Sequence, residues 1–153
     1  MLGKKKTKEH DILVFHNRFG TITASLQHKI HFPKGLIGIS ESKTFCLASA
    51  PDDKLKSFKL LQSIESEQLC FLILPIAFNN NNIVKTEDLQ KVADNLGLAT
   101  KNTAVILICS TKKVSDKMKV VVNARAPIFI DVLNKVACQC VLYNSDYSLT
   151  HIL

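Results

Sequence analysis

Short apolar runs follow one another along the chain, and two of them, 21–26 and 29–32, alternate with polar residues at a period of two. In the run 21–26, for example, Ile22, Ala24 and Leu26 share one face. Runs of this kind, rich in Ile, Val and Phe and bounded by Gly, Pro, Asn, Asp or Ser, are typical of β-strands. The pattern predicts strands at residues 12–15, 21–26, 29–32, 44–48, 58–61, 69–76, 104–109, 119–123, 128–132 and 136–143.

One segment has a helical period instead. Its apolar positions follow the spacing i, i+3, i+4 and i+7, and they are Leu89, Val92, Ala93 and Leu96. Thr86 is the expected N-cap, because its hydroxyl can accept a hydrogen bond from a free N–H of the first turn. Gly97 stands where a helix stops. The sequence therefore predicts one amphipathic helix, at about residues 87–96.

Many short strands and a single helix indicate a mostly β fold. We expect a small antiparallel β-barrel-like domain, with a compact sandwich as the alternative architecture. Closure into a barrel is attractive because exposed apolar edge strands, such as 69–74, would invite aggregation. The length of 153 residues favours a single domain. We assign residues 12–153 to this domain and residues 1–11 to a basic flexible arm.

The formal net charge of +7 raises the possibility of an anionic partner. Residues 1–10 contain four lysines and one glutamate, a net +3, which leaves +4 for the rest of the chain. The alternative function is therefore a basic small β-barrel that binds RNA or single-stranded nucleic acid directly. However, the chain has no RNP-type signature, and Phe15 and Phe32 fall in phase with core positions. We expect no specific nucleic acid partner.

The sequence predicts a cytoplasmic protein. No apolar segment of a secretory signal follows the lysine-rich start. The longest apolar run, 69–78, is about half as long as a membrane helix and contains Pro75, so we expect no membrane association. The five cysteines are then expected to be reduced. Cys138 and Cys140 share a strand face, but no second such pair exists to complete a zinc site, and all five are expected to lie in the core.

No motif of a catalytic site is present. The chain lacks G-x-S-x-G, H-E-x-x-H, a Walker loop and G-x-G-x-x-G. His28 and His31 are three residues apart, a separation that places them on opposite faces of a strand. We therefore expect that the protein is not an enzyme and that it needs no cofactor and no metal.

Three separated groups of residues carry a resemblance to a known family. They are NRFGTI at 17–22 with IHFPKGLIG at 30–38, FKLLQS at 58–63 with LCF at 69–71 and Pro75, and VNARAPI at 122–128 with QCVL at 139–142 and DY at 146–147. In this order, and spanning about residues 17–153, they resemble the FliW family of flagellar assembly factors. The chain departs from the family pattern in having Leu60 where tryptophan is usual and in being basic where many members are acidic.

This resemblance implies a function in binding. Proteins similar to FliW bind flagellin as a cytosolic chaperone and, when free, bind and antagonise the translational repressor CsrA, which couples flagellin synthesis to export. The basic charge makes flagellin the more firmly expected partner of the two. The expected partner-binding residues are Arg18, Ile37, Ile39, Gln62, Asn123, Asp146 and Tyr147. For Gln62 and Asn123, a structural hydrogen bond that closes a turn remains the alternative.

Overall fold

The computed structural model describes residues 11–153 of the chain. The chain divides into two compact units, Met1–Ile73 (unit 1) and Leu74–Leu153 (unit 2). Of the basic arm predicted for residues 1–11, all but Asp11 lies outside the described residues. The assignment of residues 12–153 to one domain stays a prediction.

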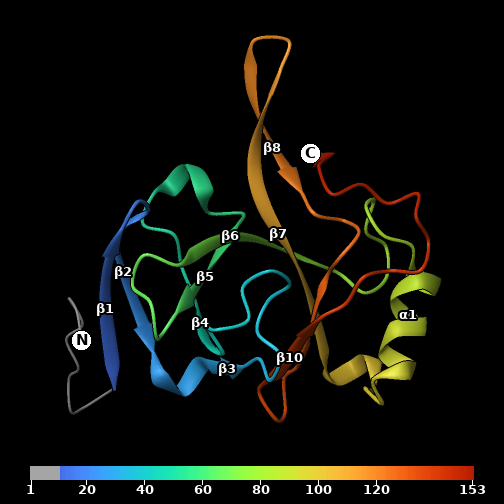
Figure 1. Cartoon of the computed structure of the whole chain (residues 1–153), viewed down its shortest axis with the longest axis horizontal. Helices are drawn as coiled ribbons and strands as arrows, with labels where there is room; N and C mark the ends of the chain where they lie inside the picture. Colours follow the sequence, from blue (N-terminus) through green and yellow to red (C-terminus); the bar gives the residue numbers. More distant parts are fainter. Residues whose placement is uncertain (1–10) are drawn as a thin grey trace. The chain divides into compact units, whose positions relative to one another are not determined.

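Unit 1 begins with a β-hairpin, which is drawn in dark blue in Figure 1. Strands β1 (Ile12–Asn17) and β2 (Gly20–Ser25) pair antiparallel along their whole length. Phe15 and Ile22 lie directly opposite each other in this register, and both side chains are fully buried. The period-two alternation read from the sequence therefore sends one face of the hairpin into the core, and full burial of each such side chain contributes about 1.5–3 kcal/mol.

The next four strands pair antiparallel in the order of the sequence, and the last of them continues past Ile73, the end of unit 1. A 3-10 turn, Leu26–His28, precedes the first of them, and a second, Asp53–Leu55, lies between the middle two. The strands are β3 (Lys29–His31), β4 (Thr44–Ala48), β5 (Lys59–Ser63) and β6 (Cys70–Ile76), with β3 pairing with β4, β4 with β5, and β5 with β6. Some buried residues of β4, β5 and β6 join those of the hairpin in one cluster, which contains Leu13, Phe15, Ile22, Ala24, Cys46, Ala48, Leu60 and Cys70.

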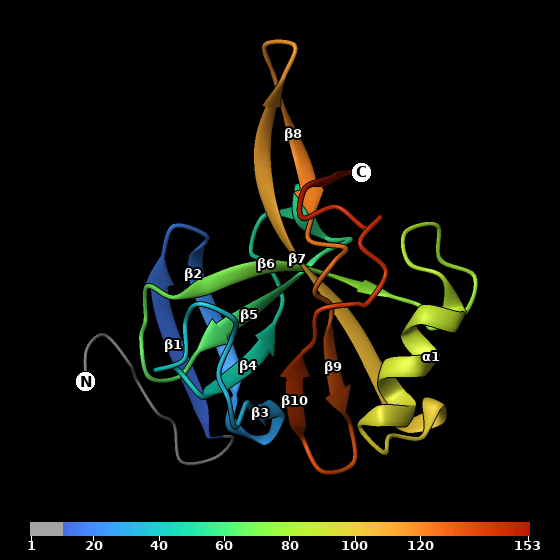
Figure 2. The ribbon, with the colours of Figure 1, turned by 45° about the vertical axis from the view of Figure 1, so that its right-hand side comes forward.

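Unit 2 is built around a long strand, β7 (Thr103–Val114), whose two parts pair with different neighbours. The first part pairs with β9 (Ile128–Asp131) and the second with β8 (Lys117–Val122), both antiparallel. Figure 2 shows β9 beside β10 (Val136–Gln139), with which it forms a hairpin. The short strand β11 (His151–Ile152) pairs with β8.

The helix of unit 2, α1 (Thr86–Asn95), begins one residue before the predicted start. Leu89, Val92 and Ala93 are buried, as their spacing predicts, and Gly97 has a φ of +70° just beyond the helix end. The core of the unit brings the helix together with the strands and contains Val84, Leu89, Val92, Val105, Ala124, Phe129 and Leu142. In residues 11–153, α1 is the only α-helix, so the predicted fold class, mostly β with one amphipathic helix, is confirmed.

Two details of the helix prediction are wrong. The N-cap residue is Lys85, which makes no side-chain capping bond, and Thr86 is already helical. The Thr86 hydroxyl instead donates to the carbonyl of Phe78, which pins the preceding loop. Leu96, assigned to the apolar face, is the C-cap residue and is 40% exposed, because the chain leaves the helix there.

The strand predictions differ most at the β7–β8 hairpin. The apolar runs end at Cys109 and begin again at Lys119, but the strands continue to Val114 and start at Lys117. The two-residue turn between them is formed by Ser115 and Asp116, both with positive φ (50° and 63°), as in the hairpin turns that match strand twist. The continuation is therefore made by lysine-rich sequence that has no apolar alternation to announce it.

The loop after β3 folds back on itself through glycines with positive φ. Gly35 has a φ of +64°, and a Cβ atom placed on it would lie 2.7 Å from the Cα of Ser40 and 2.8 Å from the carbonyl oxygen of Ile39. Gly38 has a φ of +82°, but nothing lies within 4 Å of its Cβ position. Both positions require glycine for conformation, and Gly35 requires it for space as well.

These two glycines form a matched pair for a stability test. We expect Gly38→Ala to lower the free energy of unfolding by about 1–2 kcal/mol, because an L-residue is strained at positive φ. Gly35→Ala should lower it by about 1–3 kcal/mol more, because the backbone of residues 39–40 must also move. Urea unfolding of the two variants would check the order. Equal losses would show that the close approach at Gly35 has no energetic weight.

Candidate protein-binding surface

The β1–β2 hairpin loop places the first group of expected binding residues. Asn17 and Gly20 are paired across the hairpin, so Arg18 and Phe19 form its two-residue loop, which is held by a bond from the Phe19 N–H to the Asn17 Oδ1 (3.1 Å). The exposed Arg18 donates through Nη2 to the carbonyl of Cys70 at 2.6 Å. Its guanidinium carbon lies 4.4 Å from the centre of the Phe19 ring, a cation–π arrangement.

Gln62 lies beneath this loop and is fully buried. Its Oε1 accepts from Asn17 Nδ2 at 2.8 Å, and its Nε2 donates to the carbonyls of Ser63 and Glu67, each at 3.0 Å. Asn17 Nδ2 also donates to the Glu67 carbonyl at 3.0 Å. The Gln62 amide therefore ties the first hairpin to the turn between β5 and β6. This geometry favours the structural alternative for Gln62, because its side chain has no surface to offer a partner.

Ile37 stands at the tip of the loop after β3. Leu36 and Ile39 exchange both backbone bonds (3.0 and 2.9 Å), which leaves Ile37 and Gly38 as the two-residue turn between them. Leu36 is buried, Ile39 is half-buried, and Ile37 is 57% exposed. The tight turn thus presents one large aliphatic side chain to solvent.

In unit 2, Asn123 closes a turn. Its Oδ1 accepts from the backbone N–H groups of Arg125 (3.1 Å) and Ala126 (3.0 Å), and Gln139 Nε2 donates to the carbonyl of Ala126 at 3.1 Å. These bonds shape the chain just before Pro127. The turn-closing alternative therefore accounts for the half-buried Asn123 as well.

Tyr147 fastens the C-terminal segment to the start of α1. Its hydroxyl donates to Asp88 Oδ2 at 2.5 Å and accepts from the N–H of Lys85 at 3.0 Å. Burial and this bond to the Asp88 carboxylate raise the pKa of the Tyr147 hydroxyl, because both disfavour the phenolate. Asp146 beside it is exposed, and its N–H donates to Asn144 Oδ1.

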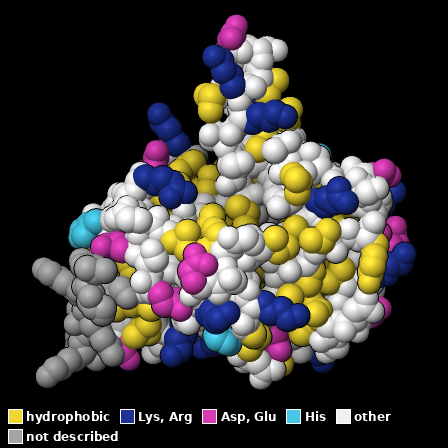
Figure 3. Space-filling model, in the orientation of Figure 1, with side chains coloured by type: hydrophobic (Ala, Val, Ile, Leu, Met, Phe, Trp, Pro, Cys, Tyr) yellow, Lys and Arg dark blue, Asp and Glu magenta, His cyan; other side chains and the backbone are white. Residues whose placement is uncertain are grey.

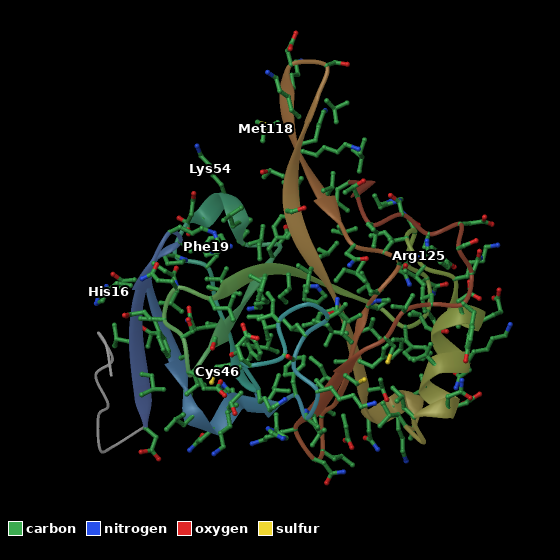
Figure 4. All side chains as sticks on the ribbon, viewed as in Figure 1. His16, Phe19, Cys46, Lys54, Met118 and Arg125 are labelled. Atoms are coloured by element: carbon green, nitrogen blue, oxygen red, sulfur yellow. The ribbon has the colours of Figure 1, made fainter. Side chains whose placement is uncertain are left out.

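Near these motifs lies a set of exposed apolar residues that the sequence reading did not single out. We call this set the C-terminal apolar surface, and its members are Val141 (55% exposed), Tyr143 (85%), Leu149 (61%), Ile152 (46%) and Leu153 (50%). Its two central segments flank one stretch of chain: the Leu142 N–H donates to the carbonyl of Arg125, and the N–H of Ala124 donates to the carbonyl of Ser148. Figure 4 labels Arg125 in this region.

The thiols divide into two kinds. Cys46, Cys70 and Cys109 are buried as expected, and burial raises their pKa values to about 11, 11 and 12 respectively, which keeps them protonated and unreactive. Cys138 and Cys140 are only half-buried, so their assignment to the core was too simple, and their sulfur atoms lie 3.5 Å apart.

Residues 11–153 contain no cluster of three or more His, Cys, Asp or Glu side chains that could hold a metal ion. In the same part of the chain, no helix has the length and apolar character needed to cross a membrane.

Comparison with known proteins finds relatives over most of the chain. The family model described as FliW protein matches residues 13–153. A flagellar assembly factor FliW of Clostridium botulinum (strain Alaska E43 / Type E3) is 32% identical over 136 residues, which cover 88% of this chain and 92% of that protein. The one from Natranaerobius thermophilus is 32% identical over 136 residues, with 88% and 87% covered. A crystal structure of a flagellar assembly factor FliW has a TM-score of 0.65 at 24% identity, and the match covers 98% of this chain and 96% of that one.

The Tyr147–Asp88 bond can be tested by titration, because the chain has only two tyrosines. In a Tyr143→Phe background, ultraviolet absorbance of the tyrosinate reports Tyr147 alone. We expect a pKa above the ordinary value of about 10, and a shift back toward it in Asp88→Asn. Glu87→Gln, one residue away on the same helix, should change it less, because Glu87 makes only a minor contribution.

The raised pKa of Tyr147 also predicts how the free energy of unfolding depends on pH. Because the folded pKa is raised, the stabilisation from Tyr147 is fully present below pH of about 10 and is lost as the pH rises through the folded pKa. In Tyr147→Phe, the free energy of unfolding should therefore fall less at alkaline pH than it does in the unchanged protein. An unchanged alkaline profile in Tyr147→Phe would contradict the assigned bond.

Proposed function

We propose a function from this premise: the chain belongs to the FliW family, whose model it matches over residues 13–153. It is accordingly a flagellar assembly factor. Its mode of action is binding, without catalysis of a reaction, and it works in the cytoplasm. The family match over nearly the whole chain is the observation that carries the proposal.

The first partner is flagellin, which the protein binds as a chaperone before export. A chaperone of this kind must offer apolar surface to a segment that is not yet packed, and the C-terminal apolar surface does so. Tyr143 is its most exposed member, and tyrosine is a residue type that concentrates binding energy. The surface is held from beneath by buried Leu142 and by the Tyr147–Asp88 bond.

The second partner is a CsrA-type translational repressor, bound when flagellin has left. Free protein then antagonises the repressor, so that export of flagellin restores its synthesis. The charge of this chain gives little electrostatic steering toward a basic RNA-binding protein, since residues 11–153 carry about +4 of the total +7. Flagellin binding is therefore the primary activity in this proposal.

The predicted contact residues now fall into two groups. Arg18, Ile37 and Asp146 are exposed and, with the half-buried Ile39, stay candidates for direct contact. The others act from beneath the surface in this proposal: Gln62, Asn123 and Tyr147 hold loops in the conformation that presents the contacts.

Flagellin binding can be localised with a matched pair of double variants. We expect Tyr143→Ala with Leu149→Ala to weaken binding of flagellin from the same genome by about tenfold or more, as loss of central apolar contacts does. Val132→Ala with Leu133→Ala removes exposed apolar side chains from the β9–β10 turn of the same unit (46% and 69% exposed) and should change affinity less than about twofold. Isothermal titration calorimetry with monomeric flagellin measures both.

Three outcomes would count against the proposal. Equal weakening by both double variants would mean that the C-terminal apolar surface is not the contact. Absence of any complex with flagellin from the same genome would overturn the chaperone function itself. Finally, saturating flagellin must weaken CsrA binding by the same factor by which CsrA weakens flagellin binding, because the coupling is reciprocal. Independent binding of the two would overturn the partner switch.

A further inference from the structure

The end of the β7–β8 hairpin, residues 111–120, forms a two-faced ribbon that we call the β-arm. Its residues alternate between faces, and the register pairs Lys112 with Lys119 and Lys113 with Met118. One face therefore carries Lys112, Lys117 and Lys119, and the opposite face carries Thr111, Lys113, Met118 and Val120. Figure 3 shows basic side chains along the projecting hairpin and an acidic one near its tip, and Figure 4 labels Met118 there.

Within residues 11–153, no acidic side chain forms a salt bridge with Lys112, Lys117 or Lys119. The β-arm has four lysines and one aspartate, a net +3. That aspartate, Asp116, lies 3.9 Å from Lys113, and both side chains are well exposed. Lys112 and Lys119 stand directly opposite each other, an arrangement of like charges that destabilises a strand pair. The exposed lysine face is thus retained against a small loss of stability, which indicates an anionic partner.

The outer edge of β8 beside this face is open. Strand β11 pairs only with Val121 and Val122, and the Leu153 N–H reaches the carbonyl of Val120. Backbone groups alternate in direction along a strand, so the N–H and C=O of Met118 point to this same outer side, two residues before Val120, which Leu153 already faces. Among residues 11–153, no other strand pairs with β8 on that side. The edge at Met118 therefore offers one backbone donor and one acceptor to an incoming strand.

We propose that the β-arm binds an acidic, extended segment of a protein partner, which adds to the sheet as a strand along the outer edge of β8. Backbone bonds to the N–H and C=O of Met118 set the position of the segment. Acidic residues at alternate positions of the segment then lie beside Lys117 and Lys119, which are themselves two residues apart on one face. This interaction goes beyond the proposed flagellin and CsrA binding, and it uses residues of the β-arm that adjoin the C-terminal apolar surface at Leu153.

A peptide fits this site better than a nucleic acid does. Non-specific binding of single strands combines a basic groove with aromatic side chains on which bases stack. Residues 103–122, which make up the whole β7–β8 hairpin, contain no aromatic residue. The phosphates of a nucleic acid can accept from a backbone N–H, but an added strand uses the N–H and the C=O of the edge together.

The test uses the full-length protein and a fluorescein-labelled peptide in which glutamate and threonine alternate, followed by fluorescence polarisation at low and near-physiological salt. Lys117→Glu with Lys119→Glu should weaken binding by about tenfold, through loss of two attractions and gain of two repulsions. The same variant should unfold at an equal or slightly higher temperature, because Lys112 then faces a glutamate. Weaker binding in a variant that is no less stable cannot come from misfolding.

Two further variants test whether peptide binding depends on general charge attraction or on addition of a strand. Lys54→Glu with Lys56→Glu makes the same change of net charge at exposed sites of unit 1, and should change affinity less than about twofold. Met118→Pro removes an outward N–H while leaving the β7–β8 bonds of Lys117 and Lys119 in place, because proline is tolerated at a strand edge. It should weaken peptide binding by about tenfold.

Each contrary result has a definite meaning. Equal weakening by the Lys54 and Lys56 variant would overturn the site in favour of general charge attraction. Unchanged binding in Met118→Pro would overturn strand addition. An oligouridylate of equal charge that binds more tightly than the peptide, and that loses binding on reversal of Lys117 and Lys119, would overturn the peptide in favour of RNA. Absence of peptide binding even at low salt would overturn the proposal as a whole.

Discussion

Burial of the Gln62 amide is the constraint on which unit 1 depends. A buried amide without partners would cost about 1–3 kcal/mol, so the chain around it must supply a donor and two acceptors in fixed places. Asn17 supplies the donor from the first hairpin, and Ser63 and Glu67 supply carbonyls from the end of β5 and the turn after it. These requirements fix the β1–β2 loop over the β5–β6 turn. Arg18 lies in the loop that these bonds hold, and its side chain is exposed.

Unit 2 uses the same device with different groups. Asn123 accepts two backbone N–H bonds and shapes the turn before Pro127, while Tyr147 bridges Asp88 and Lys85 and so ties the C-terminal segment to α1. In both units, polar residues of the family motifs hold loops in place through hydrogen bonds. This role is demanding in geometry, because an amide or phenol must lie at hydrogen-bond distance from the groups it bonds to. The side chains that are free to contact another protein are then exposed neighbours of these residues, such as Arg18 and Tyr143.

The sequence predicted the fold class, the helix and most strands, because these rest on local periodicity. The strand at 44–48 was placed at its observed bounds, and the helix within one residue. Two of the failures have a common cause: Lys117 joins β8 through backbone bonds to β7, and β11 is two residues long, so neither has an apolar pattern of its own. The strand predicted at 136–143 is a different failure, because it ends at Gln139 although the apolar pattern continues. The roles of Gln62 and Asn123 were left open for a similar reason, since their partners lie in other segments. Tyr143 could have been found, because Val141 and Tyr143 alternate with a core leucine.

The β-arm shows where local and global requirements separate. Up to Cys109 and from Val121 onward, the residues of the hairpin that face the core are apolar, and local pattern agrees with the fold. Between these points, the ladder continues although it buries little and sets Lys112 against Lys119. Disagreement of this kind is expected at sites kept for binding, because a surface matched to a partner is incomplete without it. A folded ribbon also presents its charges at fixed spacing, which a disordered lysine-rich loop would not do. By closing the hairpin, the turn at Ser115 and Asp116 therefore fixes the positions of the lysine side chains relative to one another.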